Sequence, residues 1–353
     1  MIKVRDCVAR MTAYVPGEAA LDSGVVKLNQ NENRYPMSSR ALAAARKEAS
    51  GLGLYPESSS AGVRNAAAEL YGVRPEEVMA TNGSDEILRL LFHAYCDPGD
   101  AVFAFYPSYT YYATLAAMYG ADYRLVDFTA DYRLPPGLKL PEAKLAFLPN
   151  PNAPTGTVFS GAEIRGLIEA TPNGVVVIDE AYADFAPPGT SVIPLIGEYD
   201  NLAVVRTLSK SHALAGLRVG LGFMREAALA ELDKVRDYYN LDRLAQAGGE
   251  AALRDTEWLR ETTGKIVATR ERVTGELRRL GLEVVPSGAN FIMVGFGGAE
   301  KARRVFSGLK ARKVLVRYFD KRRVDSFLRV TVGTDADMDR FLDALRGTLQ
   351  EPA

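Results

Sequence analysis

Short apolar runs alternate with longer segments of helical period between about residue 40 and residue 223. This alternation is typical of repeated βα units that build a mostly parallel sheet between helices. Runs such as Val175–Asp179 are apolar almost throughout, as expected of strands buried on both faces. The strands expected here are 101–105, 122–126, 144–148, 175–179, 203–207 and 218–223, with helices at 85–95, 108–119 and 163–170.

The pattern changes after about residue 229 to long, charged helices, and a periodic stretch at 258–280 is expected to connect two lobes. Beyond it, a smaller α+β domain is predicted from short strands near 283–285, 291–294, 314–316 and 328–331 and helices at 300–312 and 335–349. The first 37 residues are rich in turn formers and end in NQNENRYP, which indicates an extended arm. The 353 residues therefore divide into an arm (1–37), a large domain (38–250) and a small C-terminal domain (251–353).

Composition narrows the kinds of partner and chemistry to expect. Lys and Arg number 43 against 44 Asp and Glu, so no net field attracts nucleic acid or an anionic membrane. Two separated cysteines and two histidines predict neither a disulfide scaffold nor a metal site. Without a signal peptide or a long apolar run, a cytoplasmic protein is expected. The chemistry is expected to use lysine, tyrosine, aspartate or arginine.

The most informative segment is TLSKSHALAGLRVGLGF, which begins at Thr207. It places Lys210 just after a buried type of strand, where open α/β sheets bind ligands and partial desolvation favours a nucleophilic amine. The hydroxyls of Thr207 and Ser209 and the guanidinium of Arg218 are suited to holding a phosphate. A surface lysine in an ordinary loop is the alternative.

Two further segments add binding groups at strand ends. Ser84 and Asp85 begin a helix whose first amides favour an anion, although both residue types are also ordinary helix caps. Asp179 ends an apolar strand, where a carboxylate needs a cationic partner such as a pyridinium nitrogen. Asn152, in NPNAPTG, and Tyr182 are placed to bind a phenolate oxygen, and simple turn formation is the alternative for Asn152 and Asp179.

A lysine, a carboxylate for a ring nitrogen, phenolate donors and a phosphate cradle together match the groups that pyridoxal 5'-phosphate requires. Their order along the chain resembles that of the fold type I, class II pyridoxal-phosphate-dependent aminotransferases, and most closely the histidinol-phosphate aminotransferases. The resemblance extends over nearly the whole chain, through YVPGE, KLNQNEN, NGSDE, YPSYTYY, NPNAPTG, IDEAYADF, TLSKSHALAGLRVG, SGANF and LRVTVGT.

This resemblance implies a role for each matching cofactor residue. Lys210 would bind the cofactor as a Schiff base and move the proton between the substrate Cα and the cofactor C4′. Asp179 would keep the ring nitrogen protonated, Asn152 and Tyr182 would bind the phenolate oxygen, and Tyr109 would stack on the ring. The phosphate would be held by Ser84, Asp85, Thr207, Ser209, Arg218 and, from a second subunit of a homodimer, Tyr55.

The substrate residues follow from the same resemblance. Arg329 would bind the α-carboxylate of glutamate, and Arg317 with Tyr14 of the arm would bind the phosphate of histidinol phosphate. Asn31 would line the same pocket beneath the closing arm. A solvated strand-end charge is the alternative for Arg317, and NENRYP replaces the family's usual NENPYG, so the position of the arm stays open.

The function expected from the resemblance is reversible transamination of L-histidinol phosphate with 2-oxoglutarate in histidine biosynthesis. An aromatic amino acid aminotransferase and a threonine-phosphate decarboxylase-like lyase are the alternatives, because both reactions use the same cofactor residues. A ligand-binding transcriptional regulator is disfavoured by the lack of a basic surplus, and a Rossmann dehydrogenase by the absence of G-x-G-x-x-G after the first expected strand.

Overall fold

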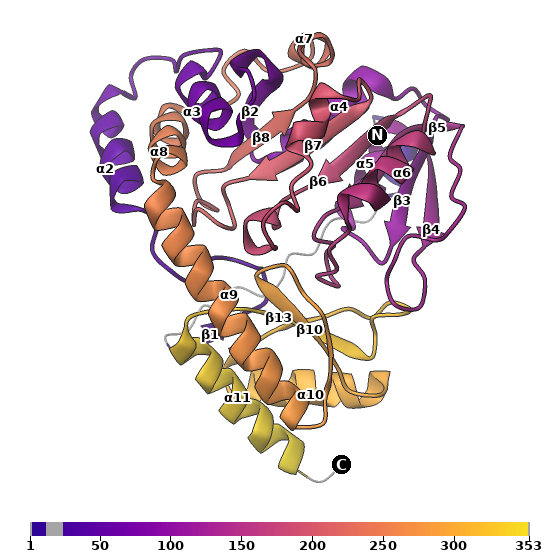
Figure 1. Ribbon diagram of the computed structural model, residues 1–353, viewed down its shortest axis with the longest axis vertical. Coiled ribbons are helices and arrows are strands. Elements are labelled where there is room, and N and C mark those ends of the chain that lie inside the picture. Colours follow the sequence, from indigo (N-terminus) through magenta and orange to yellow (C-terminus); the bar gives the residue numbers. More distant parts are fainter. Residues whose placement is uncertain (1, 12–23, 352–353) are drawn as a thin grey trace.

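The computed structural model describes residues 2–11 and 24–351 and is built around a seven-stranded sheet (Figure 1). All of its strands run parallel except β8, which is antiparallel to both of its neighbours. The strands, in spatial order, are β2 (Val78–Asn82), β8 (Val219–Phe223), β7 (Leu202–Thr207), β6 (Val175–Asp179), β5 (Ala143–Pro149), β3 (Ala101–Tyr106) and β4 (Asp122–Asp127). The expected α/β fold with a mostly parallel sheet is confirmed, and β2 is a strand that the apolar pattern did not reveal.

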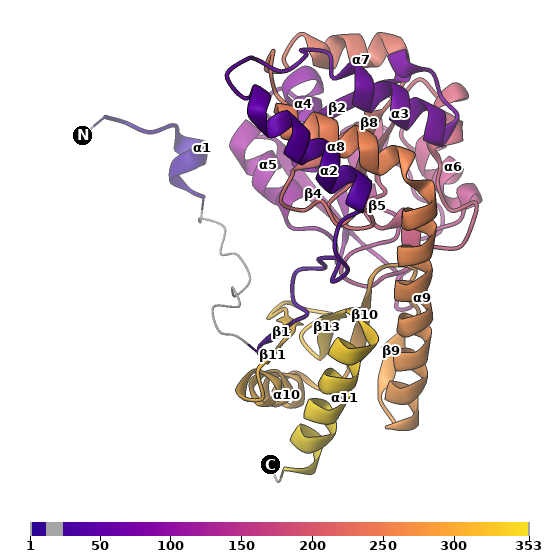
Figure 2. The same ribbon diagram turned by 90° about the vertical axis from the view of Figure 1, so that its left-hand side faces the viewer.

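Helices cover both faces of this sheet, as Figures 1 and 2 show. In β6, Val175 and Val177 belong to one apolar cluster while Val176 and Ile178 belong to another, because successive side chains of a strand point to opposite faces. The first cluster includes residues of α4 (Ser84–Tyr95), α5 (Tyr111–Tyr119) and α7 (Glu226–Asp233). The second includes residues of α2 (Ser39–Glu48), α3 (Ala61–Tyr71), α6 (Gly161–Glu169) and α8 (Arg243–Arg254).

Helix α5 begins at Tyr111, three residues later than the sequence predicted. Ser108, Tyr109 and Thr110 instead line a cavity at the edge of the sheet. The predicted start of this helix was wrong because the residue types at a binding site are set by what they contact, and they need not match the helical period.

The 24-residue helix α9 (Thr256–Arg279) follows α8 and connects the large unit to a second, smaller unit (Figure 1). That unit has a four-stranded antiparallel sheet covered by α10 (Ala299–Ala311) and α11 (Asp335–Gln350), with an apolar cluster of its own. Its strands, in spatial order, are β12 (Arg317–Tyr318), β13 (Phe327–Thr331), β10 (Phe291–Gly295) and β9 (Glu283–Val285). The boundaries proposed at residues 37 and 250 stay predictions.

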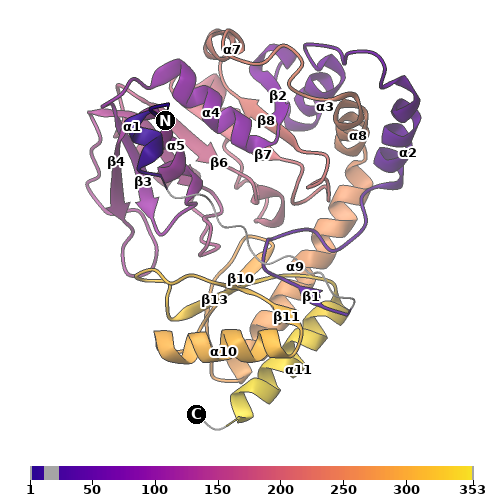
Figure 3. The same cartoon turned by 180° about the vertical axis from the view of Figure 1, so that it is seen from behind.

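The described part of the arm is more ordered than an extended segment, because β1 (Val26–Lys27) pairs in parallel with β11 (Val314–Leu315). The strand expected at 314–316 is thus divided between this pair and β12. A short helix, α1 (Asp6–Ala9), lies against α5 on the side seen in Figure 3, where the Cys7 thiol donates to the Met118 carbonyl over 3.7 Å. The remaining elements are the 3-10 helices η1 (Ala49–Gly51), η2 (Pro75–Glu77), η3 (Ala183–Phe185) and η4 (Ile193–Gly197).

Within residues 2–11 and 24–351, no helix is both long and apolar enough to cross a membrane. The same ranges contain no cluster of three or more His, Cys, Asp or Glu residues that is arranged to hold a metal ion.

Candidate active site

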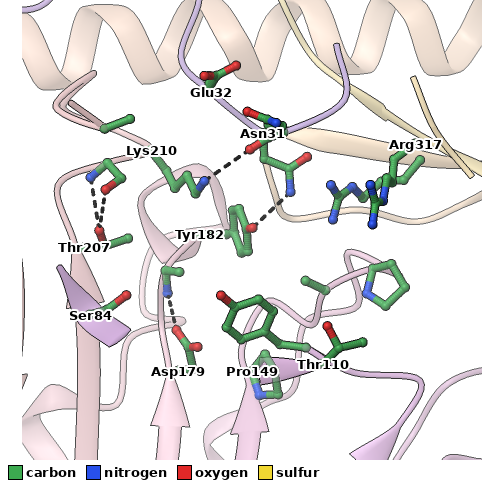
Figure 4. A pocket seen from close by; sticks show the side chains of 18 of the residues that line it. Asn31, Glu32, Ser84, Thr110, Pro149, Asp179, Tyr182, Thr207, Lys210 and Arg317 are labelled. Carbon is green, nitrogen blue, oxygen red and sulfur yellow. Dashed lines mark hydrogen bonds between the residues drawn. The ribbon is translucent and has the colours of Figure 1, made fainter. Parts of the chain in front are cut away.

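A cavity of about 440 Å³ lies at the carboxyl ends of β5, β6 and β7, where the small sheet and the arm face the large sheet. Figure 4 shows the side chains that surround it. Predicted site residues that line it are Asn31, Ser84, Asp85, Tyr109, Asp179, Tyr182, Thr207, Ser209, Lys210, Arg218, Arg317 and Arg329. Three parts of the chain that are distant in sequence therefore meet at the position that the strand pattern predicted.

Lys210 follows the end of β7 and extends its amine into this cavity (Figure 4). Its Nζ donates to the backbone carbonyl of Gln30 over 3.3 Å, so a segment of the arm contacts the amine directly. The preceding turn is held by hydroxyls, because Thr207 Oγ1 donates to Ser209 Oγ over 3.0 Å and accepts from the Ser209 amide. The geometry gives the lysine an open cavity on one side and a fixed backbone on the other.

Asp179 ends β6 with only 7% of its surface exposed. Burial raises its pKa to about 6, against hydrogen bonds from the Tyr112 hydroxyl (2.8 Å) and the Ala181 amide (3.1 Å) that favour the ionised form. The charges of Asp85 and Glu180 raise it further. Because burial disfavours the ionised carboxylate, a positively charged partner would stabilise it, and a pyridinium nitrogen bound in the cavity is suited to that role.

Tyr112 was not selected from the sequence. It is completely buried and stacks on Phe147 with ring centroids 4.6 Å apart, which directs its hydroxyl at Asp179. The only sequence signal was its place in the aromatic run YPSYTYY.

The phosphate cradle forms where β2 runs into α4. Gly83 has a φ of +76°, and a side chain there would meet the guanidinium of Arg218. A Cβ on Gly220 would meet the backbone of Gly83 and Ser84, so glycine at both positions allows this close approach. The turn leaves the first amides of α4 at one end of the cavity, which is a suitable place for a phosphate.

Two charged side chains at the cradle are paired with each other. Arg218 Nη2 lies 3.5 Å from Asp85 Oδ2, and the Tyr109 hydroxyl donates to Asp85 Oδ1 over 3.4 Å. The side chain of Asp85 is therefore an acceptor that orients Arg218, and its backbone amide is the group suited to an anion. Tyr109 also lies edge-on to Tyr112, with centroids 5.5 Å apart.

Tyr182 and Asn152 occupy different kinds of position. Tyr182 lines the cavity and its hydroxyl accepts a hydrogen bond from Asn31 Nδ2 over 3.0 Å (Figure 4). Asn152 is fully buried outside the cavity lining, and its amide donates to the Pro107 carbonyl and to Thr155 Oγ1. In this arrangement, Tyr182 is the better placed of the two for a phenolate oxygen, and the role of Asn152 stays a prediction.

The opposite wall of the cavity carries two arginines on neighbouring strands. Arg317 of β12 and Arg329 of β13 are directly paired in register, and both guanidinium groups lie over the Phe319 ring, 5.5 and 5.4 Å from its centroid. Arg329 Nη2 also donates to the Asn29 carbonyl over 3.0 Å. Two cations held side by side in this way suit a substrate with a carboxylate or a phosphate.

Tyr14 falls outside the described residues. Tyr55 lies away from this cavity, 76% exposed, where its ring stacks on that of Tyr239 with centroids 4.4 Å apart.

His212 lies close to Lys210 in the sequence but outside the cavity lining. Burial lowers its pKa to about 4, and its Nδ1 is hydrogen-bonded to the Ser211 hydroxyl over 2.9 Å.

A buried ion network below Lys210 was also missed. Arg206 Nε donates to Glu180 Oε2 over 3.0 Å, and Arg206 Nη1 donates to Asp184, which in turn accepts from the Ser211 hydroxyl. The network connects the segment after β6 with the loop that holds Lys210, and so fixes Lys210 relative to Asp179 and Tyr182.

The fold and this cavity define a fold type I enzyme whose cofactor is pyridoxal 5'-phosphate. A family model for class I and II aminotransferases matches residues 23–345, and the chain belongs to that family. It is 45% identical to the histidinol-phosphate aminotransferase of Geotalea daltonii over 98% of this chain and 99% of that one. It is 42% identical to the enzyme of the same name from Synechocystis, over 99% of this chain and 100% of that one.

Among solved structures, the chain resembles the histidinol-phosphate aminotransferase of Sinorhizobium meliloti in complex with pyridoxal 5'-phosphate. The TM-score is 0.90 at 24% identity, over 99% of this chain and 98% of that one. An aspartate aminotransferase of Thermus thermophilus is similar with a TM-score of 0.82 at 21% identity. At these identities the two structures confirm the fold.

Proposed function

We propose that this protein transfers the amino group of L-histidinol phosphate to 2-oxoglutarate, giving imidazole-acetol phosphate and glutamate, reversibly, in histidine biosynthesis in the cytoplasm. The observation that supports it most is the meeting of Lys210, Asp179 and the Arg317–Arg329 pair in one cavity. Full-length relatives that are 42–45% identical bear the name histidinol-phosphate aminotransferase. Small-molecule substrates are thus its partners, and neither nucleic acid nor a membrane is.

The cofactor, when bound, supplies an aromatic ring that accepts the electrons released when a bond at the substrate Cα breaks. Asp179 holds a proton on the ring nitrogen, and this proton makes the ring a better acceptor of those electrons. The carboxylate is prepared for this task because its burial makes a nearby positive charge favourable.

Lys210 holds the cofactor and then moves the proton from the substrate Cα to the cofactor C4′. It suits both tasks because its amine projects from the fixed turn after β7 into the cavity. The turn between β2 and α4, with Ser84, Thr207, Ser209 and Arg218, anchors the phosphate at the far end, so the reacting atoms stay near the amine.

The two arginines select and orient the substrate. Arg329 forks onto the α-carboxylate of glutamate and Arg317 binds the phosphate of histidinol phosphate. The segment from Asn29 to Glu32 lines the cavity beside them and keeps water from the reacting centre. Tyr14 belongs to the same arm and is proposed to contribute to the phosphate site.

A homodimer completes the proposed site. Large apolar side chains are exposed at Leu52, Leu54, Tyr55, Tyr238 and Tyr239, and such an accumulation is typical of a protein interface. The stack of Tyr55 on Tyr239 holds the tyrosine ring outward from its own subunit. Tyr55 then reaches the cofactor phosphate of the partner subunit.

The substrate assignment is tested with three amino donors. We expect kcat/KM for L-histidinol phosphate to exceed that for L-phenylalanine by about 100-fold, since a charge-assisted contact between the phosphate and the half-buried Arg317 is worth about 1.5–3 kcal/mol. Similar values would make the protein an aromatic amino acid aminotransferase. Release of carbon dioxide from O-phospho-L-threonine would make it a lyase of the threonine-phosphate decarboxylase type.

Arg317→Ala tests the phosphate contact itself. Its kcat/KM for histidinol phosphate should fall about 100-fold and that for glutamate much less, because a charge-assisted contact is lost from one substrate alone. Arg304→Ala, which changes an exposed arginine of α10, is the matched control. An equal loss for both substrates would reassign Arg317.

A further inference from the structure

Asn31 is a buried residue of the arm that is hydrogen-bonded through both its backbone and its side chain. It is 1% exposed and has a φ of 55°, in the left-handed region that asparagine tolerates better than most residues. Its backbone carbonyl accepts from Asn290 Nδ2 over 3.0 Å, and its backbone amide donates to Thr331 Oγ1 over 2.9 Å. Asn31 thereby joins the arm to the small unit.

The hydrogen bonds of Thr331 fix which way the side-chain amide points. Thr331 Oγ1 accepts from the Asn31 backbone amide and donates its one proton to Asn31 Oδ1 over 3.2 Å. The amide oxygen therefore faces Thr331, and Nδ2 faces the Tyr182 hydroxyl at 3.0 Å. Figure 4 shows this hydrogen bond across the cavity from Asp179.

The direction of that hydrogen bond decides what Tyr182 can do. A phenol has one proton to donate, and here its oxygen accepts from Asn31. Among the described residues, no acceptor for the proton of Tyr182 lies within hydrogen-bonding distance. The proton is thus available to a group bound in the cavity.

We infer that Asn31 is a positioning residue that keeps Tyr182 as a hydrogen-bond donor to the phenolate oxygen of the cofactor. This inference rests on the proposed function, since it requires pyridoxal 5'-phosphate in the cavity. It gives Asn31 a task different from the substrate contact that the sequence suggested. It also implies that the hydrogen bond from Tyr182 to the cofactor depends on the positions of the arm and of Thr331.

The exchange of Asn31 for aspartate tests the inference closely. Aspartate has the same shape, tolerates the left-handed backbone and still accepts from Thr331, but it replaces the donor facing Tyr182 with an acceptor. Tyr182 then donates to residue 31 and no longer to the cofactor. Since a donor stabilises an anionic oxygen, its loss should raise the pH midpoint at which the visible absorption of the bound cofactor changes.

The measurement is a pH titration of that absorption in the wild type, Asn31→Asp, Tyr182→Phe and the double variant. A hydrogen bond to a charged group is worth about 1.5–3 kcal/mol, which corresponds to an upward shift of about one to two pH units in each single variant. The double variant should show no more than a small addition to the shift of Tyr182→Phe. Equal shifts from Asn31→Asp in both backgrounds would overturn the inference, because a simple charge effect does not require the tyrosine.

Asn33→Asp is the matched control, since it adds the same charge two residues away, where the side chain contacts the Ser211 carbonyl and not Tyr182. It should move the midpoint much less than Asn31→Asp, and an equal shift would count against the inference. If Asn31→Asp does not fold, Asn31→Gly, which also suits the left-handed backbone, is compared in both backgrounds by the same criterion.

The outcomes for the inference and for the proposed function are distinct. A wild-type protein that acquires no visible absorption with pyridoxal 5'-phosphate would refute the cofactor site and the inference together. A wild type that binds the cofactor, with a shift in Tyr182→Phe but none in Asn31→Asp, would refute the inference alone.

Discussion

Replacing Asp179 with asparagine should stabilise the cofactor-free protein while impairing its use of the cofactor. Burial raises the pKa of Asp179 from 3.8 to about 6, so the folded protein binds the carboxyl proton more tightly than the unfolded chain does. The stability from this group is complete below the unfolded pKa and is lost as the pH rises through the folded value. At neutral pH the ionised carboxylate is therefore a cost to folding.

The size of the effect follows from the shift. About two pKa units at 1.36 kcal/mol each give about 3 kcal/mol at about pH 8, and roughly half of that at about pH 5. Asparagine removes this titration, and its amide can still pair with the Tyr112 hydroxyl and the Ala181 amide that contact Asp179. Asp179→Asn should therefore be the more stable protein, and its advantage should grow with pH.

Urea unfolding of both cofactor-free proteins, followed by circular dichroism, measures this difference directly. Saturating pyridoxal 5'-phosphate should stabilise the wild type more than the variant, because the ring nitrogen supplies the missing positive charge to Asp179 alone. A variant that is less stable at about pH 8, or an advantage equal at about pH 5 and pH 8, would refute the reasoning.

Two other substitutions test the support of the site. Tyr112→Phe removes a hydrogen bond that lowers the pKa of Asp179, so that pKa should rise by about one unit or more and cofactor affinity at neutral pH should fall. Tyr123→Phe, which changes a half-buried tyrosine of β4, should leave the affinity near the wild-type value. Unchanged affinity in Tyr112→Phe would remove this tyrosine from the site. Gly220→Ala places a methyl group against the backbone of Gly83, which should displace the phosphate cradle and weaken cofactor binding about tenfold or more. Equilibrium titration with the cofactor measures this affinity, and a wild-type value would contradict the tight packing at Gly220.

The large sheet was predictable because its strands leave a simple signal. Val175–Asp179 is buried on both faces, and its apolar run predicts a strand of that kind. Lys210 and Asp179 could be selected for the same reason, since each follows or ends a strand of that kind. The order of strands and the position of their carboxyl ends then place both residues in one cavity.

Other features depend on contacts between distant parts of the chain. Val26 pairs with Val314, and Asn31 contacts Thr331, across nearly 300 residues of sequence. Neither segment has a pattern that names its partner. Local periodicity reports which face of an element is buried, but not which element covers it.

The residues that support the site from behind were missed for a related reason. Tyr112 resembles an ordinary core aromatic in the sequence, and only its stacking on Phe147 shows that the hydroxyl points at Asp179. Conversely, Asn152 matched a family motif but is held by Pro107 and Thr155 outside the cavity lining. A motif specifies residue types, whereas hydrogen-bond direction depends on the packed structure.

The central claim is that Lys210 and its neighbours move an amino group from histidinol phosphate to the cofactor. The most direct test is the visible spectrum of the protein loaded with pyridoxal 5'-phosphate, recorded while L-histidinol phosphate is added without any keto acid. The wild type should lose its visible band and regain it on addition of 2-oxoglutarate, while Lys210→Ala, folded by circular dichroism, should show no such cycle. A wild type whose band is unaffected by histidinol phosphate, or a Lys210→Ala variant that completes the cycle, would contradict the account.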